Sequence, residues 1–271
     1  TKILNTEFEI ITSDWRETKD LTISLLKASV PDIALVHDLG FAATLFSSAN
    51  KHKIKDIIIG QSWRTEGIAP LKWNYYDGVY LNDIHKKFGT LKLRKWRPDD
   101  SGYSLGLYQI IYYVILKRIR SCSILYYYDY DRTQARELIT KELGWKDTGA
   151  HYYDDLYQVL YTIYLKRKFN IDRRKFNYSA LIRSNQLKRE KAIERINNPD
   201  YPLFNEDGLR LCLERLGISK SFFEDCIKKQ NKYFYDYKNV LSFIKLFKPF
   251  IYLMVKLNLV LQTTYIKYFN L

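Results

Sequence analysis

The stretch 57–68 constrains the fold most, because a run of three isoleucines leads there into a polar turn bounded by glycines. A short, β-branched, continuously apolar run after an amphipathic segment is typical of a buried strand in a parallel sheet. Open α/β sheets bind ligands in the crevice beyond the carboxyl ends of their strands. The sequence therefore places a candidate ligand site after Ile59. An ordinary strand-to-loop turn is the alternative interpretation.

Three residues of this turn suit a nucleotide. Gly60 permits a close backbone approach or a positive φ angle. Thr65 and Glu66 provide a hydroxyl and a carboxylate, which suit a ribose or a phosphate-bound metal ion.

The segments before this strand follow the order expected of an α/β domain. Residues 7–12 alternate and end apolar, as a strand does, and Asp14 can cap a helix in which Glu17 reaches back. A second helix is predicted from about residue 32 to 50, and its buried side is marked by Ile33, Val36, Phe41, Leu45 and Ala49. This order predicts an α/β fold with part of a Rossmann-like parallel sheet, whose beginning we expect ahead of Thr1.

Helices dominate the rest of the chain. We predict a packed helix over 105–119 and further helices over 132–143, 154–168, 172–183, 187–197, 206–216 and 219–229. The apolar, basic tail 235–271 is interrupted too often by lysines for a membrane span. It therefore lies on a membrane surface, or it packs on a partner or on the domain. We predict an α/β domain over 1–100, a helical substrate or partner domain over 101–230, and a helical tail over 231–271.

The charge and the cysteines narrow the functional class. A net charge of +14 suits nucleic acid, an anionic membrane or an anionic substrate, but scattered lysines also arise from an AT-rich genome. Cys122, Cys212 and Cys226 are far apart, which argues against a zinc ribbon or a disulfide framework and fits a reducing compartment. No secretory signal opens the chain, so we expect a cytoplasmic protein, with or without membrane attachment.

Two further places carry candidate polar residues. Asp38 sits among apolar neighbours, where it either caps a turn or faces a ligand. Residues 151–155 (HYYDD) form the densest titratable cluster of the chain. A histidine beside carboxylates suits acid–base chemistry, although a surface histidine at a helix start is the simpler interpretation.

Seven short segments resemble the N-acetyl sugar amidotransferase family in the family's own order. They are 26–32 (LKASVPD), 65–68 (TEGI), 84–89 (IHKKFG), 142–147 (ELGWKD), 151–152 (HY), 168–172 (KFNID) and 179–182 (SALI). The resemblance extends over about residues 7–228 and is carried by the ordered set rather than by any one segment. That family belongs to the PP-loop ATP pyrophosphatases, which have a HUP-type α/β domain.

The resemblance implies an activity, cofactors and partners. Family members convert an N-acetyl group of a sugar into an acetamidino group in the biosynthesis of bacterial surface glycans such as lipopolysaccharide O-antigen. ATP, with Mg²⁺, activates the amide oxygen, and ammonia then displaces AMP. The ammonia comes from a glutaminase through a synthase-like subunit, and the sugar is N-acetylated and nucleotide-linked or acidic. Nucleic acid is not an expected partner.

The resemblance also assigns residues. Gly60, Thr65 and Glu66 are expected on the nucleotide side, and Asp32 and Asp38 near the activated amide or the metal. His151 and Tyr152 are expected on the sugar side, where Asp154 takes the place of a displaced acid.

Several positions depart from the family pattern. The phosphate-binding Ser-Gly-Gly-x-Asp-Ser loop and the N-terminal cysteine cluster are absent and are expected before Thr1. Gln61 and Ser62 replace a glycine and an asparagine, Tyr153 and Asp154 follow His151-Tyr152 in place of Glu-Ser, and Asn185 replaces a glycine. A PP-loop enzyme that modifies tRNA and a non-catalytic partner subunit remain alternatives.

Overall fold

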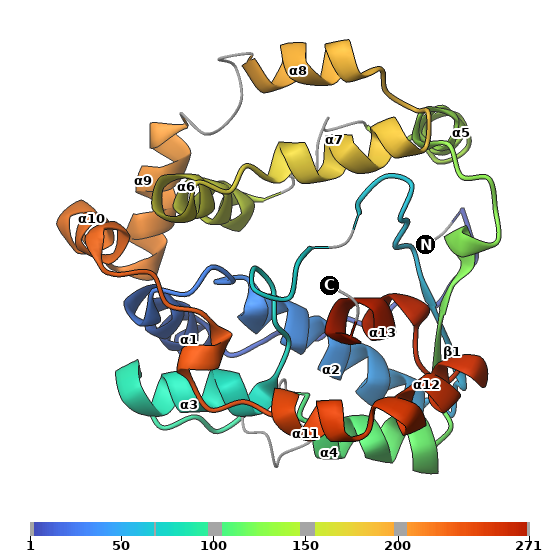
Figure 1. Ribbon diagram of the computed structural model, residues 1–271, viewed down its shortest axis with the longest axis horizontal. Coiled ribbons are helices and arrows are strands. Elements are labelled where there is room, and N and C mark those ends of the chain that lie inside the picture. Colours follow the sequence, from blue (N-terminus) through green and yellow to red (C-terminus); the bar gives the residue numbers. More distant parts are fainter. Residues whose placement is uncertain (1–2, 68, 97–104, 147–154, 198–204, 270–271) are drawn as a thin grey trace.

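The computed structural model describes residues 3–67, 69–96, 105–146, 155–197 and 205–269 of the 271-residue chain. Its elements are α1 (Trp15–Ala28), α2 (Leu35–Lys51), β1 (Asp56–Ile59), α3 (Gly78–Phe88), α4 (Leu107–Ile111), the π-helix η1 (Tyr112–Leu116), β2 (Arg120–Ser123), the 3₁₀ helix η2 (Ile124–Tyr126), α5 (Arg132–Leu143), α6 (Leu156–Phe169), α7 (Arg173–Arg183), α8 (Arg189–Asn197), α9 (Glu206–Leu216), α10 (Lys220–Lys228), the 3₁₀ helix η5 (Phe234–Asp236), α11 (Leu241–Leu246), α12 (Lys248–Lys256) and α13 (Gln262–Phe269). Figure 1 shows α5 to α9 above α1 to α4 and α11 to α13. The fold is α/β, with a small parallel sheet and a mainly helical C-terminal half.

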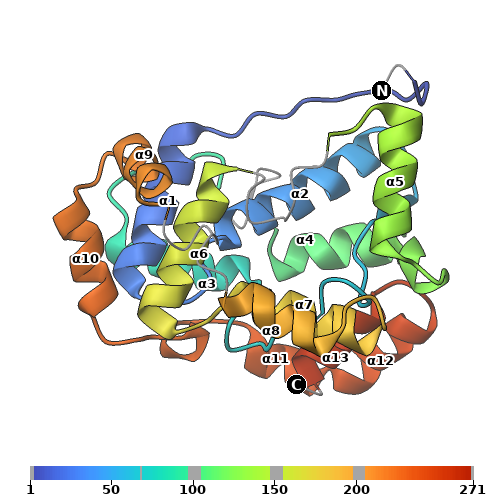
Figure 2. The same ribbon diagram turned by 90° about the horizontal axis from the view of Figure 1, so that it is seen from above.

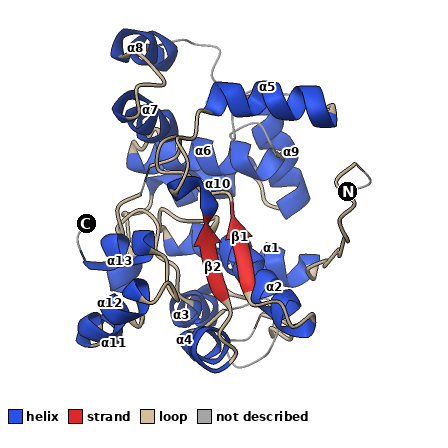
Figure 3. Ribbon diagram, turned by 90° about the vertical axis from the view of Figure 1, so that its right-hand side faces the viewer, coloured by secondary structure: helices blue, strands red, loops and turns tan. Residues whose placement is uncertain are grey.

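The two described strands form a parallel pair, which confirms the predicted strand at the isoleucine run. Asp56 is in register with Arg120, and an ion pair of 2.7 Å joins their side chains. Figure 3 shows the strands side by side, and α2 packs against β1. Ile57 is buried, but Ile58 is 69% exposed. The predicted burial of this strand is therefore confirmed for Ile57 and wrong for Ile58.

The predicted strand at 7–12 is also wrong. This segment is extended but belongs to no sheet, and its side chains are exposed. Glu9 holds it against the C-terminal part of α2 by accepting hydrogen bonds from Ser48 and Lys51. An alternating sequence fits a strand, but a strand also needs a neighbouring backbone with which to form a ladder.

Helix α2 forms where it is predicted, and its predicted buried side is confirmed in part. Ile33, Val36 and Ala49 are buried as predicted, but Phe41 and Leu45 are exposed. Leu39 and Ala43 are buried instead. Gly40 faces the Trp96 ring, which lies 2.9 Å from the position that a Cβ atom would take. The Trp96 ring therefore packs directly on the backbone of α2 at Gly40.

The main core joins α1, α3, α6, α9 and α10. Leu21, Leu25 and Ile84 are fully buried in it, and the Tyr164 hydroxyl donates to the Val30 carbonyl at 3.0 Å. The Lys168 ammonium donates to the carbonyls of Cys226 and Lys229, each at 2.7 Å. Lys168 therefore satisfies carbonyls at the end of α10, which have no partners within that helix.

Two acidic residues of α1 hold the loop after α3. Glu17 accepts hydrogen bonds from the backbone amides of Arg94, Lys95 and Trp96 at 2.8 to 3.2 Å. The predicted capping role of Glu17 is therefore wrong, and Asp14 caps α1 through the Arg16 amide.

The second acid, Asp20, accepts bonds from the amides of Thr90 and Leu91, from the Thr90 hydroxyl and from His85. Burial opposes ionisation of Asp20, but these bonds outweigh it and hold its pKa below the ordinary value. The loop therefore binds internal carboxylates through its own amides.

The helices after residue 130 follow the prediction closely. Asp131 caps α5, and Gly144 and Gly217 end α5 and α9 in the left-handed region. Ser219 caps α10 through the Phe222 amide. Residues 105–119 do not form one helix, however: α4 continues into a π-helix, and β2 follows. The three-part division of the chain stays a prediction.

Candidate functional site

The turn after β1 is a single helical turn. The Ser62 carbonyl accepts from the amides of Thr65 at 3.3 Å and Glu66 at 2.9 Å. Thr65 is buried and Glu66 is exposed. Gly67, at φ +73°, closes the turn, so of the two roles expected for Gly60 the positive φ belongs to Gly67 instead. Apart from its two chain neighbours, no described residue has a heavy atom within 4 Å of the position that a Cβ atom of Gly60 would take, so the described part of the chain leaves space beside this backbone.

The segments that follow β1 and β2 both pack around this turn. The Trp63 ring meets the Tyr126 ring edge-on at 4.6 Å, which brings the segments after β1 and β2 together. The Ser184 hydroxyl at the end of α7 donates to the Arg64 carbonyl at 2.7 Å. Carboxyl ends of parallel strands meet at one edge of a sheet, and the turn therefore lies where α/β folds place ligands.

We expect Gly67→Ala to lower the free energy of unfolding by about 1–2 kcal/mol, since a Cβ atom is strained in the left-handed region. Gly60→Ala is the matched control and changes it by less than about 0.5 kcal/mol, because the added methyl group meets open space. Urea unfolding followed by circular dichroism measures both. Equal losses in the two variants would contradict the assignment of the strained position to Gly67.

A second polar group surrounds Asp32, just before α2. Asp32 is 3% exposed, and its Oδ1 atom accepts from the Tyr161 hydroxyl at 3.3 Å. Its Oδ2 atom has no hydrogen-bond partner among the described residues. Burial, followed by the charge of Asp38, raises the pKa of Asp32 to about 8. The carboxyl group therefore carries a proton at neutral pH.

Lys267 of α13 faces this group from the far end of the chain. Its ammonium donates to Asn74 Oδ1 and lies 4.3 Å from the centre of the Tyr76 ring. Burial lowers the pKa of Lys267 to about 8, although the charges of Asp32 and Asp38 act to raise it. Asp32 and Lys267 are therefore an acid and a base that both titrate close to neutral pH.

Tyrosines and one histidine complete this group. The Tyr157 hydroxyl donates to the Ile33 carbonyl, and its ring meets His37 edge-on at 4.1 Å. Burial raises the pKa of Tyr157 and Tyr161 and lowers that of His37, while the Asp155 charge opposes the shift of His37. We call Asp32, Asp38, Tyr157, Tyr161 and Lys267 the Asp32 cluster.

Helix α13 connects the Asp32 cluster to the turn. Thr263 lies near the Tyr126 hydroxyl, and burial, aided by the charge of Glu66, raises the Tyr126 pKa. Lys267 follows Thr263 by four residues, or about 6 Å along a helix axis. The turn and the Asp32 cluster therefore flank successive turns of one helix, whose position is shown in Figure 1.

The structure brings together part of the predicted site. Asp32 and Asp38 belong to one electrostatic group, and Gly60, Thr65 and Glu66 share the turn. His151, Tyr152 and Asp154 lie outside the described residues. Asp155, which follows them in the sequence, caps α6 through the Gln158 amide at 2.9 Å. The charge of Asp155 acts on the pKa of His37, so the start of α6 lies close to His37 and the Asp32 cluster.

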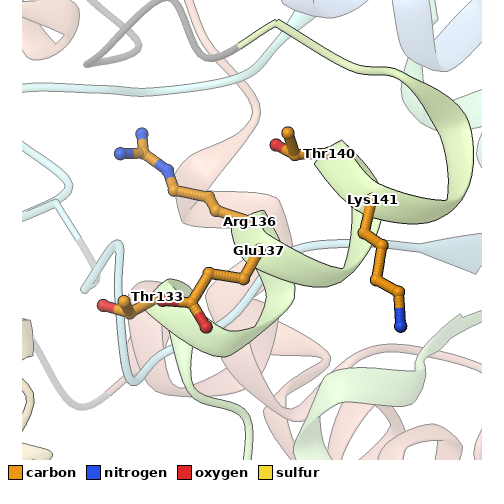
Figure 4. Close-up of a pocket in the computed structure, with 5 residues that line it drawn as sticks. All are labelled: Thr133, Arg136, Glu137, Thr140 and Lys141. Atoms are coloured by element: carbon orange, nitrogen blue, oxygen red, sulfur yellow. The ribbon is translucent and has the colours of Figure 1, made fainter.

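A surface hollow lies apart from these groups. It lies along α5 and is lined by Thr133, Arg136, Glu137, Thr140 and Lys141 (Figure 4). All five residues come from one helix, and none is a predicted site residue. No group of three or more metal-binding acids, histidines or cysteines occurs among the described residues.

One comparison with known proteins gave a match. Residues 128–249 match the model of a family described as LPS biosynthesis protein WbpG-like, C-terminal domain. The matched segment runs from the end of η2 to the start of α12 and includes Tyr157 and Tyr161 of the Asp32 cluster. No curated protein and no solved structure matches the chain. The match supports a relation to lipopolysaccharide biosynthesis proteins.

Proposed function

We propose that this protein is an ATP-dependent amidotransferase that converts an N-acetyl group of a sugar into an acetamidino group in bacterial surface glycan biosynthesis. One observation carries the proposal: the segment that matches a lipopolysaccharide biosynthesis family supplies two tyrosines to a buried acid–lysine cluster. A neutral carboxyl group beside a lysine of similar pKa suits repeated proton transfer at neutral pH.

The reaction needs activation because an amide carbon is a poor electrophile. Attack of the amide oxygen on ATP forms an adenylylated imidate and releases pyrophosphate, and ammonia then displaces AMP. Protons leave the amide nitrogen and the attacking ammonia during these steps. We assign their acceptance to the deprotonated fraction of Asp32 and Lys267, which is the minor form at neutral pH and grows toward pH 8, because both pKa values are about 8.

The turn after β1 fits the nucleotide. Open space beside Gly60 allows the backbone to approach a phosphate or a ribose, and the same turn contains the buried hydroxyl group of Thr65. Mg²⁺ bound to ATP takes most of its ligands from phosphates and water and needs only one or two protein carboxylates. The exposed Glu66 is the carboxylate that this turn offers. Asp32 is buried and largely protonated, so it suits the amide side of the site better than the metal.

The sources of the other reactants are also part of the proposal. Ammonia reaches the site from a glutaminase through a synthase-like subunit. The N-acetylated sugar, nucleotide-linked or acidic, has a negative charge that suits this basic chain.

The test supplies ammonium ions in place of the glutaminase. Purified protein is incubated with ATP, Mg²⁺ and a panel of N-acetylated nucleotide sugars, and AMP and pyrophosphate are measured. Mass spectrometry follows replacement of the amide oxygen by an imino group. We expect Asp32→Asn to lower kcat by about 10²-fold and Thr65→Val to raise the KM for ATP. Glu214→Gln, on the exposed side of α9, is the control and keeps full activity.

Two results would contradict the proposal. A folded protein that releases no AMP with any sugar of the panel favours a non-catalytic partner subunit. ATP-dependent modification of tRNA, with binding that weakens steeply as salt is raised, favours the alternative PP-loop enzyme.

A further inference from the structure

The helices α11 and α12 carry large apolar side chains toward solvent. Leu246 is 74% exposed and Leu257 57%. Apart from Tyr252, which is also exposed, the exposed set is Phe243, Leu246, Phe247, Phe250, Leu253 and Leu257. Its members recur every three or four residues, so they follow one side of a helical path. A helix on the surface of a globular domain normally presents polar residues there.

An adjacent side of the same helices already has a partner in the domain. Met254 is buried, Ile244 and Ile251 are half-buried, and α12 packs against α13. Figure 2 shows α11 and α12 along one margin of the molecule, with α13 beside α12. The exposed set is therefore a second apolar side, which we call the outer face of α11–α12.

The charges beside the outer face have one sign. Residues 237–271 contain five lysines and no aspartate or glutamate. Lys245, Lys248 and Lys256 are exposed on α11 and α12 and make no ion pair with a described residue. Lys248 lies 5.7 Å from the centre of the Phe269 ring, and Lys256 lies 5.4 Å from that of Tyr252. A surface that is both apolar and lysine-rich is complementary to lipid tails under anionic headgroups.

These helices are too short to cross a bilayer. The nine residues of α12 span about 13 Å, whereas the hydrocarbon core of a bilayer is about 30 Å thick. No helix in the described part of the chain is long and apolar enough for a membrane span. The outer face therefore suits a helix pair that lies in the plane of the interface.

We propose that the outer face of α11–α12 binds an anionic membrane surface, with the apolar side chains inserted between headgroups and the lysines paired with lipid phosphates. A second copy of the chain fits less well. In a two-fold contact the same patch meets itself, so the lysines of one copy would face those of the other.

Vesicle sedimentation of the full chain tests this proposal. The vesicles contain either phosphatidylcholine alone or phosphatidylcholine with about 30% phosphatidylglycerol, an anionic lipid. We expect at least about tenfold tighter binding to the anionic vesicles, lost at high salt. Phe250→Ser with Leu253→Ser, and separately Lys245→Glu with Lys248→Glu, each weaken that binding by about tenfold or more.

The controls lie on α5, where Leu138 is exposed to a similar extent as Leu257. Leu138→Ser and Lys141→Glu keep wild-type binding, and circular dichroism verifies that all variants fold. Three results would overturn the proposal: no binding to anionic vesicles, equal binding to both vesicle types, or unchanged binding by the α11–α12 variants. Gel filtration that shows a dimer broken by Phe250→Ser with Leu253→Ser would assign the outer face to a second copy instead.

Discussion

Replacement of Arg174 by methionine is expected to lower the free energy of unfolding by about 3–5 kcal/mol, because it leaves the buried Asp172 carboxylate without its partner. The two side chains are 5% and 3% exposed. Arg174 donates to Asp172 twice, from Nε at 3.1 Å and from Nη2 at 2.7 Å. Its Nη1 atom donates to the Arg195 carbonyl at 2.9 Å, which ties α8 to α7. Urea unfolding followed by circular dichroism measures the loss.

The matched control is an arginine pair on the surface. Arg210 pairs with Glu214 one turn along α9 at 3.0 Å, and both side chains are more than half exposed. Arg210→Met should change stability by less than about 0.5 kcal/mol, because water screens the pair. Adding Asp172→Asn to Arg174→Met removes the unpaired charge and should restore part of the loss. Similar losses for Arg174→Met and Arg210→Met would show that burial of the first pair does not govern its effect.

Elements whose signals are local could be predicted from the sequence. The isoleucines of β1, the capping Asp131 and Ser219, and the stop residues Gly144 and Gly217 each act within a few residues. Strand β2 was missed because its sequence, RSCS, has no apolar run. It is a strand because its backbone pairs with β1, 64 residues away at the Arg120–Asp56 pair. Pairing of this kind leaves little trace in the residues of the paired strand.

The wrong prediction of burial for Phe41 and Leu45 has a similar cause. Periodicity predicted that Phe41 and Leu45 face the core, because α2 carries apolar residues on more than one side. The partner surfaces select the buried side, and they select Leu39 and Ala43. Likewise, residues 7–12 alternate like a strand but find no ladder in the described chain.

The residues of the candidate site likewise differ in whether the sequence could predict them. Asp32 and Asp38 lie six residues apart, and a resemblance carried by short segments could indicate both. Lys267 meets Asn74 across 193 residues and lies in a tail that the resemblance does not reach. Tyr157 and Tyr161 are one helical turn apart on α6, but twenty-four tyrosines in the chain hide that spacing. Only the folded arrangement shows that these groups share one charge environment.

The second large expected effect concerns Asp32 and Lys267. We expect their joint contribution to the free energy of unfolding to pass through a minimum near pH 8. Asp32 has a folded pKa of about 8, far above the value of about 4 for an unfolded chain. Between these values the folded state retains a proton that the unfolded state has lost, so stability falls as pH rises. Lys267 has a folded pKa of about 8, below the unfolded value of about 10.4. The unfolded state binds more protons above pH 8, so stability then rises.

Two variants separate the fall in stability below pH 8, caused by Asp32, from the rise above pH 8, caused by Lys267. The free energy of unfolding in urea is measured from pH 5 to pH 10. Asp32→Asn keeps the shape of the side chain but cannot ionise, so its stability relative to wild type should increase steadily from pH 5 to pH 8. Lys267→Met removes the rise in stability above pH 8, so the stability of this variant relative to wild type should decrease above pH 8. A difference between Asp32→Asn and wild type that stays constant over this range would show that the Asp32 carboxyl ionises alike in both states. The acid–lysine pair would then lose its assigned role in proton transfer.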